Sequence, residues 1–315
     1  MARTPACGSA LDFWACTRLN PVFLAFEAEP VIRTLMKSLP VLVLCLSFAA
    51  MAADGPLSAS GIDLDQRLNR CLADPDKPST GDQDQCISEA THAWDARLNA
   101  SYETLRGALP EAARPALLKA QRAWLASRDA DLKLIAAVYA TVRGTMYAPM
   151  NANDVMVLTR RRAQILTRYS ADIENASESV FRMDGRLTPA KVEKEEGGSA
   201  VPQRGLAFER KHCQGLTEPA TIARCAAQAT AQYTKDIDDE TRRIEQRLPV
   251  ASRVAMRTSA SQWRTFMSME KALVAAVCPA ADTSQGQACR AVQARNEALA
   301  RLQKLVHLEA MIDAN

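Results

Sequence analysis

The cysteines are the residues whose chemistry this sequence constrains most. Nine are present, and Cys7, Cys16 and Cys45 lie before or within a segment that we interpret below as a signal peptide. Six remain: Cys71, Cys86, Cys213, Cys225, Cys278 and Cys289. An even number of cysteines in an exported protein indicates disulfide bonds. Zinc binding is the alternative, but the sequence has no C-x-x-C motif and no histidines at ligand spacing.

The positions of these six cysteines predict three local bridges. Within the first half of the chain, Cys71 and Cys86 have only each other as partners. The internal repeat described below then pairs Cys213 with Cys225, which leaves Cys278 for Cys289. We therefore expect the disulfides Cys71–Cys86, Cys213–Cys225 and Cys278–Cys289.

Catalytic motifs are not found in the sequence. It has no nucleophile elbow, no H-E-x-x-H, no phosphate-binding loop and no glycine-rich turn after a strand. His92, His212 and His307 are scattered, and none has a catalytic partner close to it in the sequence. We predict that the protein is not an enzyme, and we expect no cofactor and no metal ion.

The N-terminal region contains a processing signal. Met36 and Lys37 precede an apolar run that is too short to span a membrane, and the small-residue site Ala50-Met51-Ala52 follows it. A basic start, a short apolar run and an A-x-A site are typical of a Sec signal peptide. We predict a signal peptide at 36–52, cleavage after Ala52, and a periplasmic or secreted mature protein without a stable membrane anchor.

Residues 1–35 then look like a misassigned upstream start, and residues 53–66 like a polar leader. The alternative is a genuine N-terminal extension that keeps the apolar run as an uncleaved anchor.

Charge excludes some classes of partner. The formal net charge is +3, with basic and acidic residues interleaved along the chain. This is neither the basic footprint of a nucleic-acid-binding protein nor a strongly acidic field. We interpret the run Asp236, Asp238, Asp239 and Glu240 as a solvated helix face.

An internal repeat organises the chain. The stretch 116–139 is rich in alanine and leucine and lacks glycine and proline, and a weaker copy lies at 255–278. Trp124 and Trp263 are 139 positions apart, and the same offset relates Cys86 to Cys225 and Leu109-Pro110 to Leu248-Pro249. Each copy is therefore expected to form one structural unit.

The periodicity predicts helices only. Apolar residues recur every three to four positions in each copy, and no stretch alternates as a strand does. We predict an all-α protein with two tandem antiparallel three-helix bundles, each clamped by disulfides, at 67–176 and 208–315. Residues 177–207 carry glycine, proline and a charge run without periodicity, which predicts a flexible, protease-sensitive linker.

Three motifs in the first copy resemble a known family. They are Leu98-Asn99-Ala100-Ser101-Tyr102, Gln121-Arg122-Ala123-Trp124 and Arg128-Asp129-Ala130. Together with the pair Cys71 and Cys86, and with Gly144-Thr145, Leu158-Thr159, Arg162 and Leu166 in the same order, they are similar to the lysozyme inhibitor LprI-like domain of exported bacterial proteins. The second unit looks like a diverged copy that keeps Trp263, its cysteines and the spacing from Cys289 to Arg295 and Leu299.

The sequence also departs from the family pattern. A cysteine usually follows the Arg-Asp-Ala run in this family, but Asp131 stands there. The second copy has Ala260, Met267 and Ser268 where the first has Gln121, Arg128 and Asp129. Any role of those polar residues therefore belongs to the first copy alone.

The candidate site consists of Gln121, Trp124, Arg128 and Asp129. Gln121 and Arg128 are two helical turns apart, so they share one helix face with Trp124. Two interpretations are open. The residues form a buried polar group that fixes helix register, with Arg128 bonded to a carbonyl or carboxylate, or they form a recognition patch anchored by Trp124.

The resemblance implies that the protein inhibits a lysozyme or another cell-wall hydrolase by binding it directly. One physical point opposes this function: animal-type lysozymes are basic, and neither unit has the negative net charge that would speed association. The alternative is an envelope interaction or toxin-neutralising module without lysozyme activity. We expect a protein partner and no nucleic acid in either case.

Overall fold

A computed structural model of the chain describes residues 61–174, 204–278 and 282–313. The expected signal peptide, most of the polar leader and nearly all of the linker at 177–207 lie outside these residues, so the predictions about them remain predictions.

Every long element in the described part of the chain is an α-helix, which confirms the all-α prediction. The first copy contains α1 (Gly61–Leu72), α2 (Thr80–Ala108), α3 (Arg114–Tyr139) and α4 (Tyr147–Glu174). The second contains α5 (Arg204–His212), α6 (Pro219–Arg247), α7 (Arg253–Val277) and α8 (Ser284–Asp313). A short helix followed by three long ones thus occurs twice, as the repeat predicted.

Local sequence explains where the helices begin. Ser79 caps α2: its hydroxyl accepts from the backbone N–H of Asp82, and the carboxylate of Asp82 accepts from the backbone N–H of Ser79. Glu218 caps α6, and Pro219 occupies its first turn. After Leu109-Pro110 and Leu248-Pro249, a 3-10 turn (η1, Glu111–Ala113, and η3, Val250–Ser252) leads directly into α3 and α7.

All three predicted disulfides are confirmed. Cys71–Cys86 joins α1 to α2, Cys213–Cys225 joins the end of α5 to α6, and Cys278–Cys289 joins the end of α7 to α8. Each bridge closes a short loop of 11 to 15 residues. The bridges therefore hold neighbouring helices together within a copy, and none of them joins the two copies.

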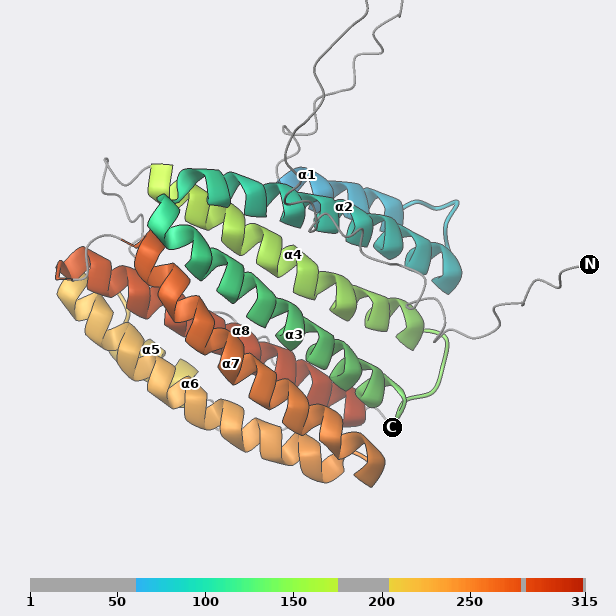
Figure 1. Ribbon diagram of the computed structural model, residues 1–315. Coiled ribbons are helices and arrows are strands. Elements are labelled where there is room, and N and C mark those ends of the chain that lie inside the picture. The colour runs from blue at the N-terminus through green and yellow to red at the C-terminus, as the bar shows by residue number, and fades with distance from the viewer. Residues whose placement is uncertain (1–60, 175–203, 279–281, 314–315) are drawn as a thin grey trace, which may run out of the picture. The chain divides into compact units, whose positions relative to one another are not determined.

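The two copies are joined instead through their middle helices. Within each copy the outer long helices pack together, α2 against α4 and α6 against α8. The main neighbour of α3 is α7 of the other copy, not α2, to which a short turn connects it. Figure 1 shows α3 and α7 side by side, with α4 and α2 beyond α3 and α6 beyond α7, while α8 runs behind the two middle helices in this view.

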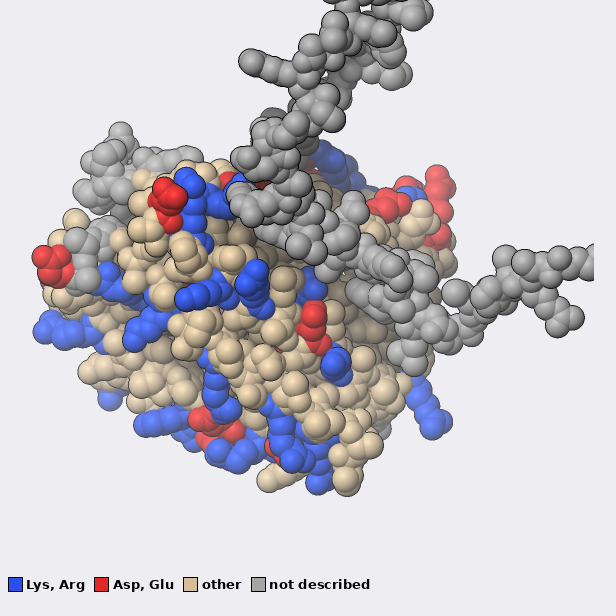
Figure 2. Space-filling model, viewed as in Figure 1, with Lys and Arg blue, Asp and Glu red and all other residues tan. Residues whose placement is uncertain are grey.

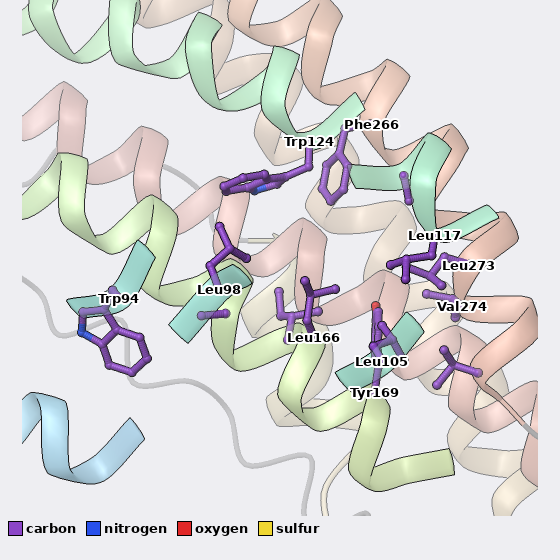
Figure 3. Packing of buried hydrophobic residues seen from close by; sticks show 14 of the residues in the cluster. Trp94, Leu98, Leu105, Leu117, Trp124, Leu166, Tyr169, Phe266, Leu273 and Val274 are labelled. Carbon is purple, nitrogen blue, oxygen red and sulfur yellow. The ribbon is translucent and has the colours of Figure 1, made fainter. Parts of the chain in front are cut away.

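The buried apolar residues form two large clusters, and each draws on both copies. One contains Leu117 and Trp124 from the first half of α3 together with Phe266 and Leu273 from the second half of α7 (Figure 3). The other contains Leu134 and Val138 of α3 with Met256 of α7 and much of α6 and α8. Thus α3 and α7 run antiparallel, and the copies share one interior that the sequence analysis did not anticipate.

The interpretation of the acidic run in α6 as a solvated face is wrong for two of its residues. Asp236 and Glu240 are buried, because α5 and α8 pack over this side of α6. One oxygen of Asp236 accepts from the backbone N–H of Gly205 and the other from the guanidinium of Arg204. The acidic run therefore fastens the short helix α5 to α6.

The shared interior gives a first prediction. When a specific protease site is placed within residues 185–200 and cut, the halves should elute together at the mass of the intact protein. The reason is that the apolar contact between α3 and α7 holds the halves together without a covalent bond. Native size-exclusion chromatography, with a denaturing gel to prove cleavage, measures this. Two separately eluting halves, each helical by circular dichroism, would show that each copy folds alone.

The disulfides give a second prediction. Replacing Cys213 and Cys225 by serine should lower the free energy of unfolding by about 2–4 kcal/mol, since a bridge restricts the unfolded chain. The Cys71 and Cys86 double variant should lose a similar amount, because its loop is of similar length. Guanidinium denaturation with and without reductant checks both. A pair of cysteines whose removal costs nothing would contradict the expected role of that bridge.

Candidate functional site

Gln121 lies at the junction of three helices. Its side-chain oxygen accepts a hydrogen bond from Nε of Arg162 in α4, at 3.0 Å. Arg162 is 1% exposed and donates through Nη1 to Oε1 of Glu270 in α7, at 2.8 Å. Gln121 therefore links α3 to an ion pair between α4 and α7.

The ion pair between Arg162 and Glu270 connects the two copies. Glu270 is 2% exposed, and its Oε1 also accepts from the hydroxyl of Tyr169 at 3.0 Å. Burial, reinforced by the charge of Glu270, raises the pKa of Tyr169 well above its ordinary value, so its hydroxyl remains a donor. All the groups of this network come from three different helices, and their geometry fixes how α4 meets α7.

A second ion pair mirrors the first. Asp131 of α3 accepts from Nη1 of Arg301 in α8 at 2.8 Å, and from Ser259 of α7 and Lys304 of α8. Burial would raise the pKa of Asp131, but the charges of Lys304 and Arg301 outweigh this and lower it. Asp131 and Arg301 stand 139 positions from Glu270 and Arg162, respectively, which is the offset of the repeat. In each copy, the arginine of the last helix thus pairs with a carboxylate on the middle helix of the other copy.

The two tryptophans of the repeat take part in the same arrangement. The guanidinium of Arg162 lies over Trp124, 5.9 Å from the ring centroid, and that of Arg301 lies over Trp263 at 5.7 Å. Such cation–π contacts are stronger where the groups are desolvated. Trp124 is 8% exposed and belongs to the apolar cluster drawn in Figure 3. Each buried arginine is therefore held by one tryptophan of its own copy and one carboxylate of the other.

Arg128 and Asp129 lie apart from this buried network. Arg128 donates to the carboxylate of Asp129 next to it, and that carboxylate is 59% exposed. The guanidinium of Arg128 also lies 5.3 Å from the ring centroid of Trp124. Of the four predicted residues, Gln121 and Trp124 contact the buried network, whereas Arg128 pairs with Asp129 and reaches the network only through Trp124.

Asp131, Glu270 and Arg301 belong to this network but are not among the site residues predicted from the sequence. The signal was present, because the offset that relates the tryptophans also relates the carboxylates and the arginines. The second copy was instead matched through Arg295. In the structure Arg295 pairs with Glu209 of α5, and Arg301 occupies the position equivalent to Arg162.

A cleft of about 370 Å³ opens beside the network. Residues from α3, α4, α7 and α8 line it, including Trp124, Arg162, Trp263, Phe266, Arg301 and Lys304. Burial and the nearby charge of Arg301 lower the pKa of Lys304 to about 8, and the opposite charge of Asp131 limits this shift. The Lys304 side chain is 21% exposed. Lys304 therefore remains mostly charged at neutral pH.

No group of three or more histidine, cysteine or acidic side chains in the described ranges is arranged to hold a metal ion. None of the helices in the same ranges combines the length and the apolar character needed to cross a membrane.

Comparison with known proteins finds a family to which part of the first copy is similar. The sequence model of the family described as "Lysozyme inhibitor LprI" matches residues 71–166. This segment is therefore similar to the LprI family. It runs from the first cysteine of the Cys71–Cys86 bridge through α2 and α3 into α4 and includes Gln121, Trp124, Asp131 and Arg162. The resemblance found in the sequence is thereby confirmed.

Solved structures extend the fold to both copies. A crystal structure of an uncharacterized protein from Burkholderia thailandensis matches with a TM-score of 0.52 and 22% sequence identity. The match covers 78% of this chain and 95% of that chain, so it includes helices outside the LprI segment. At this identity the match shows the fold alone. No curated protein matches the sequence.

The network gives a third prediction. Arg162→Met should lower the free energy of unfolding by about 3–5 kcal/mol, since it leaves Glu270 buried and unpaired. Adding Glu270→Met should cost less than the sum of the single changes, because no charge then remains without its partner. Guanidinium denaturation of the full double-mutant cycle measures this.

The matched control is Arg106→Met. Its ion pair with Glu103 is more than half exposed, so the loss should stay within about 1 kcal/mol. If Arg162→Met costs no more than the control, the ion pair does not hold the copies together.

Proposed function

We propose that this protein is an exported inhibitor of a lysozyme-type cell-wall hydrolase and that it acts by binding the hydrolase directly. The observation that carries the proposal is the match of residues 71–166 to the lysozyme inhibitor family LprI. A directly binding inhibitor needs a fixed surface rather than catalytic groups, which agrees with the sequence in having no catalytic motif.

Neither repeat unit has a negative net charge, but acidic residues are concentrated in one segment of the first copy. Six carboxylates and one lysine lie between Leu72 and Ala96: Asp74, Asp76, Lys77, Asp82, Asp84, Glu89 and Asp95. We call this segment the clamped acidic end. Figure 2 shows acidic side chains gathered where the α1–α2 connection lies in Figure 1. A local acidic surface is enough to steer a basic lysozyme, whatever the net charge of the whole chain.

The clamped acidic end is also held in shape before any partner binds. The Cys71–Cys86 bridge joins its two sides with a Cα–Cα distance of 5.8 Å. The capping box of Ser79 and Asp82 fixes the start of α2, and Asp74 accepts a hydrogen bond from the backbone N–H of Asp76. A surface ordered in advance loses little conformational entropy on binding, which favours affinity.

A turbidity assay tests the function. The exported and purified protein should slow the lysis of a cell-wall suspension by a basic animal-type lysozyme, in proportion to inhibitor concentration. The same preparation after reduction and denaturation is the control. Undiminished lysis at inhibitor concentrations well above that of the enzyme would refute lysozyme inhibition and favour the envelope-interaction alternative.

Charge reversal gives a fourth prediction. Asp76, Glu89 and Asp95 are exposed, so changing all three to lysine should preserve the fold. The association rate with a basic lysozyme should fall about tenfold or more at low salt, because steering is lost. Surface plasmon resonance at two salt concentrations measures the rate.

The control variant combines Glu103→Lys and Glu111→Lys. Both residues are exposed and lie outside the clamped acidic end, toward the other end of α2. This variant should bind nearly as the unchanged protein does. Equal rate losses in the two variants would place the binding surface elsewhere.

A further inference from the structure

We infer that the cleft between α3, α4, α7 and α8 is a binding site for a small organic carboxylate. The inference is independent of lysozyme inhibition, because it rests on the residues that line the cleft and not on the clamped acidic end. At about 370 Å³ the cleft falls within the range typical of small-ligand pockets.

The three carboxylates that line the cleft already have donors from the protein. Asp131 accepts from Arg301, Lys304 and Ser259. Asp154 accepts from the hydroxyl of Tyr139 at 2.8 Å and lies 3.0 Å from Nε2 of His307. Glu297 accepts from Arg161 at 3.1 Å. The acidic groups of the cleft therefore do not need a cationic ligand.

Donors are left over. Nη2 of Arg162 and Nε of Arg301 are buried and have no hydrogen-bond partner among the described residues. Both arginines line the cleft and are at most 2% exposed. Leaving such a charged donor without an acceptor is costly, whereas a carboxylate oxygen would satisfy it with a charge-assisted hydrogen bond. One oxygen of Glu270 is also unpaired, but Glu270 is not part of the cleft lining.

The walls of the cleft suit the ring or apolar part to which the carboxylate of the ligand is attached. Trp124, Trp263 and Phe266 supply aromatic surface on the α3 and α7 side. Trp124 and Trp263 are equivalent in the two copies, and so are Arg162 and Arg301, so each copy contributes one equivalent arginine–tryptophan pair to the cleft. A carboxylate attached to an aromatic ring or to a sugar ring meets both the donors and these walls.

The test uses two probe pairs that differ chiefly in the carboxylate. Benzoate and benzamide share a ring, and N-acetylmuramate adds a lactyl carboxylate to N-acetylglucosamine. The indole N–H signals of the ¹⁵N-labelled full chain are followed during titration and assigned by tryptophan-to-phenylalanine variants. Trp94 serves as an internal reference, because it is not part of the cleft lining and lies apart from Trp124 in Figure 3.

The expected result is that at least one carboxylate shifts the Trp124 and Trp263 signals and leaves that of Trp94 in place. Its neutral counterpart should bind at least about tenfold more weakly, since hydrogen bonds to charged groups are the stronger ones. The pair that responds distinguishes an aromatic acid from a cell-wall sugar acid. Equal binding of acid and neutral probe, shifts spread over all tryptophans, or no shift up to about 50 mM would overturn the inference.

A cleft-filling variant completes the test without removing a charge. Ala300 of α8 lines the cleft, so Ala300→Leu should weaken carboxylate binding at least about tenfold, as a side chain would take the space of the ligand. Ala310→Leu, also partly buried on α8 but outside the cleft lining, should bind as the unchanged protein does. A cooperative thermal transition shows that each variant is folded. Unchanged binding to folded Ala300→Leu protein would place the ligand elsewhere.

Discussion

Two buried arginines, Arg162 and Arg301, hold the two copies of this protein together. Each pairs with a carboxylate on the middle helix of the other copy, Glu270 or Asp131, and each lies over a tryptophan of its own copy. A buried charge is tolerated only where its partner is in place, so these pairs require α4 to lie against α7 and α8 to lie against α3. Because the arginine of each copy pairs with a carboxylate of the other copy, the two helical repeats share one interior.

This constraint explains why the disulfides are all local. The apolar clusters and the crossed ion pairs already join the copies, and each cluster contains residues of both α3 and α7. The bridges instead tie α1 to α2, the end of α5 to α6 and the end of α7 to α8. Covalent bonds thus stabilise neighbours in sequence, and buried charges and apolar packing fix the long-range arrangement.

The clamped acidic end and the cleft differ in chemistry and in the interactions that hold them in shape. The clamped acidic end belongs to the first copy and to the LprI segment, and its shape depends on a disulfide and a helix cap. The cleft is built from both copies and depends on the crossed ion pairs. A surface made by local structure suits recognition of a protein partner, while a concave site with buried donors suits a small molecule.

Local features of this protein could be read from its sequence. The helices follow from three-to-four spacing, the turns from Leu109-Pro110 and Leu248-Pro249, and the disulfides from cysteine positions within a repeat. Spacing along one helix also placed Gln121 on the same face as Trp124. What spacing cannot give is the partner of a helix face, because an apolar stripe packs equally well on any complementary stripe.

Only the tertiary structure decided that α3 packs against α7, that Asp236 and Glu240 are buried, and that Arg301 pairs with Asp131 of the other copy. Asp131 shows the difference most clearly. In the sequence it is the residue that replaces a family cysteine, and in the structure it is the carboxylate that holds α8 of the other copy. A lone acidic residue in a helix does not reveal its partner, because that partner lies 170 positions away and is brought near only by folding.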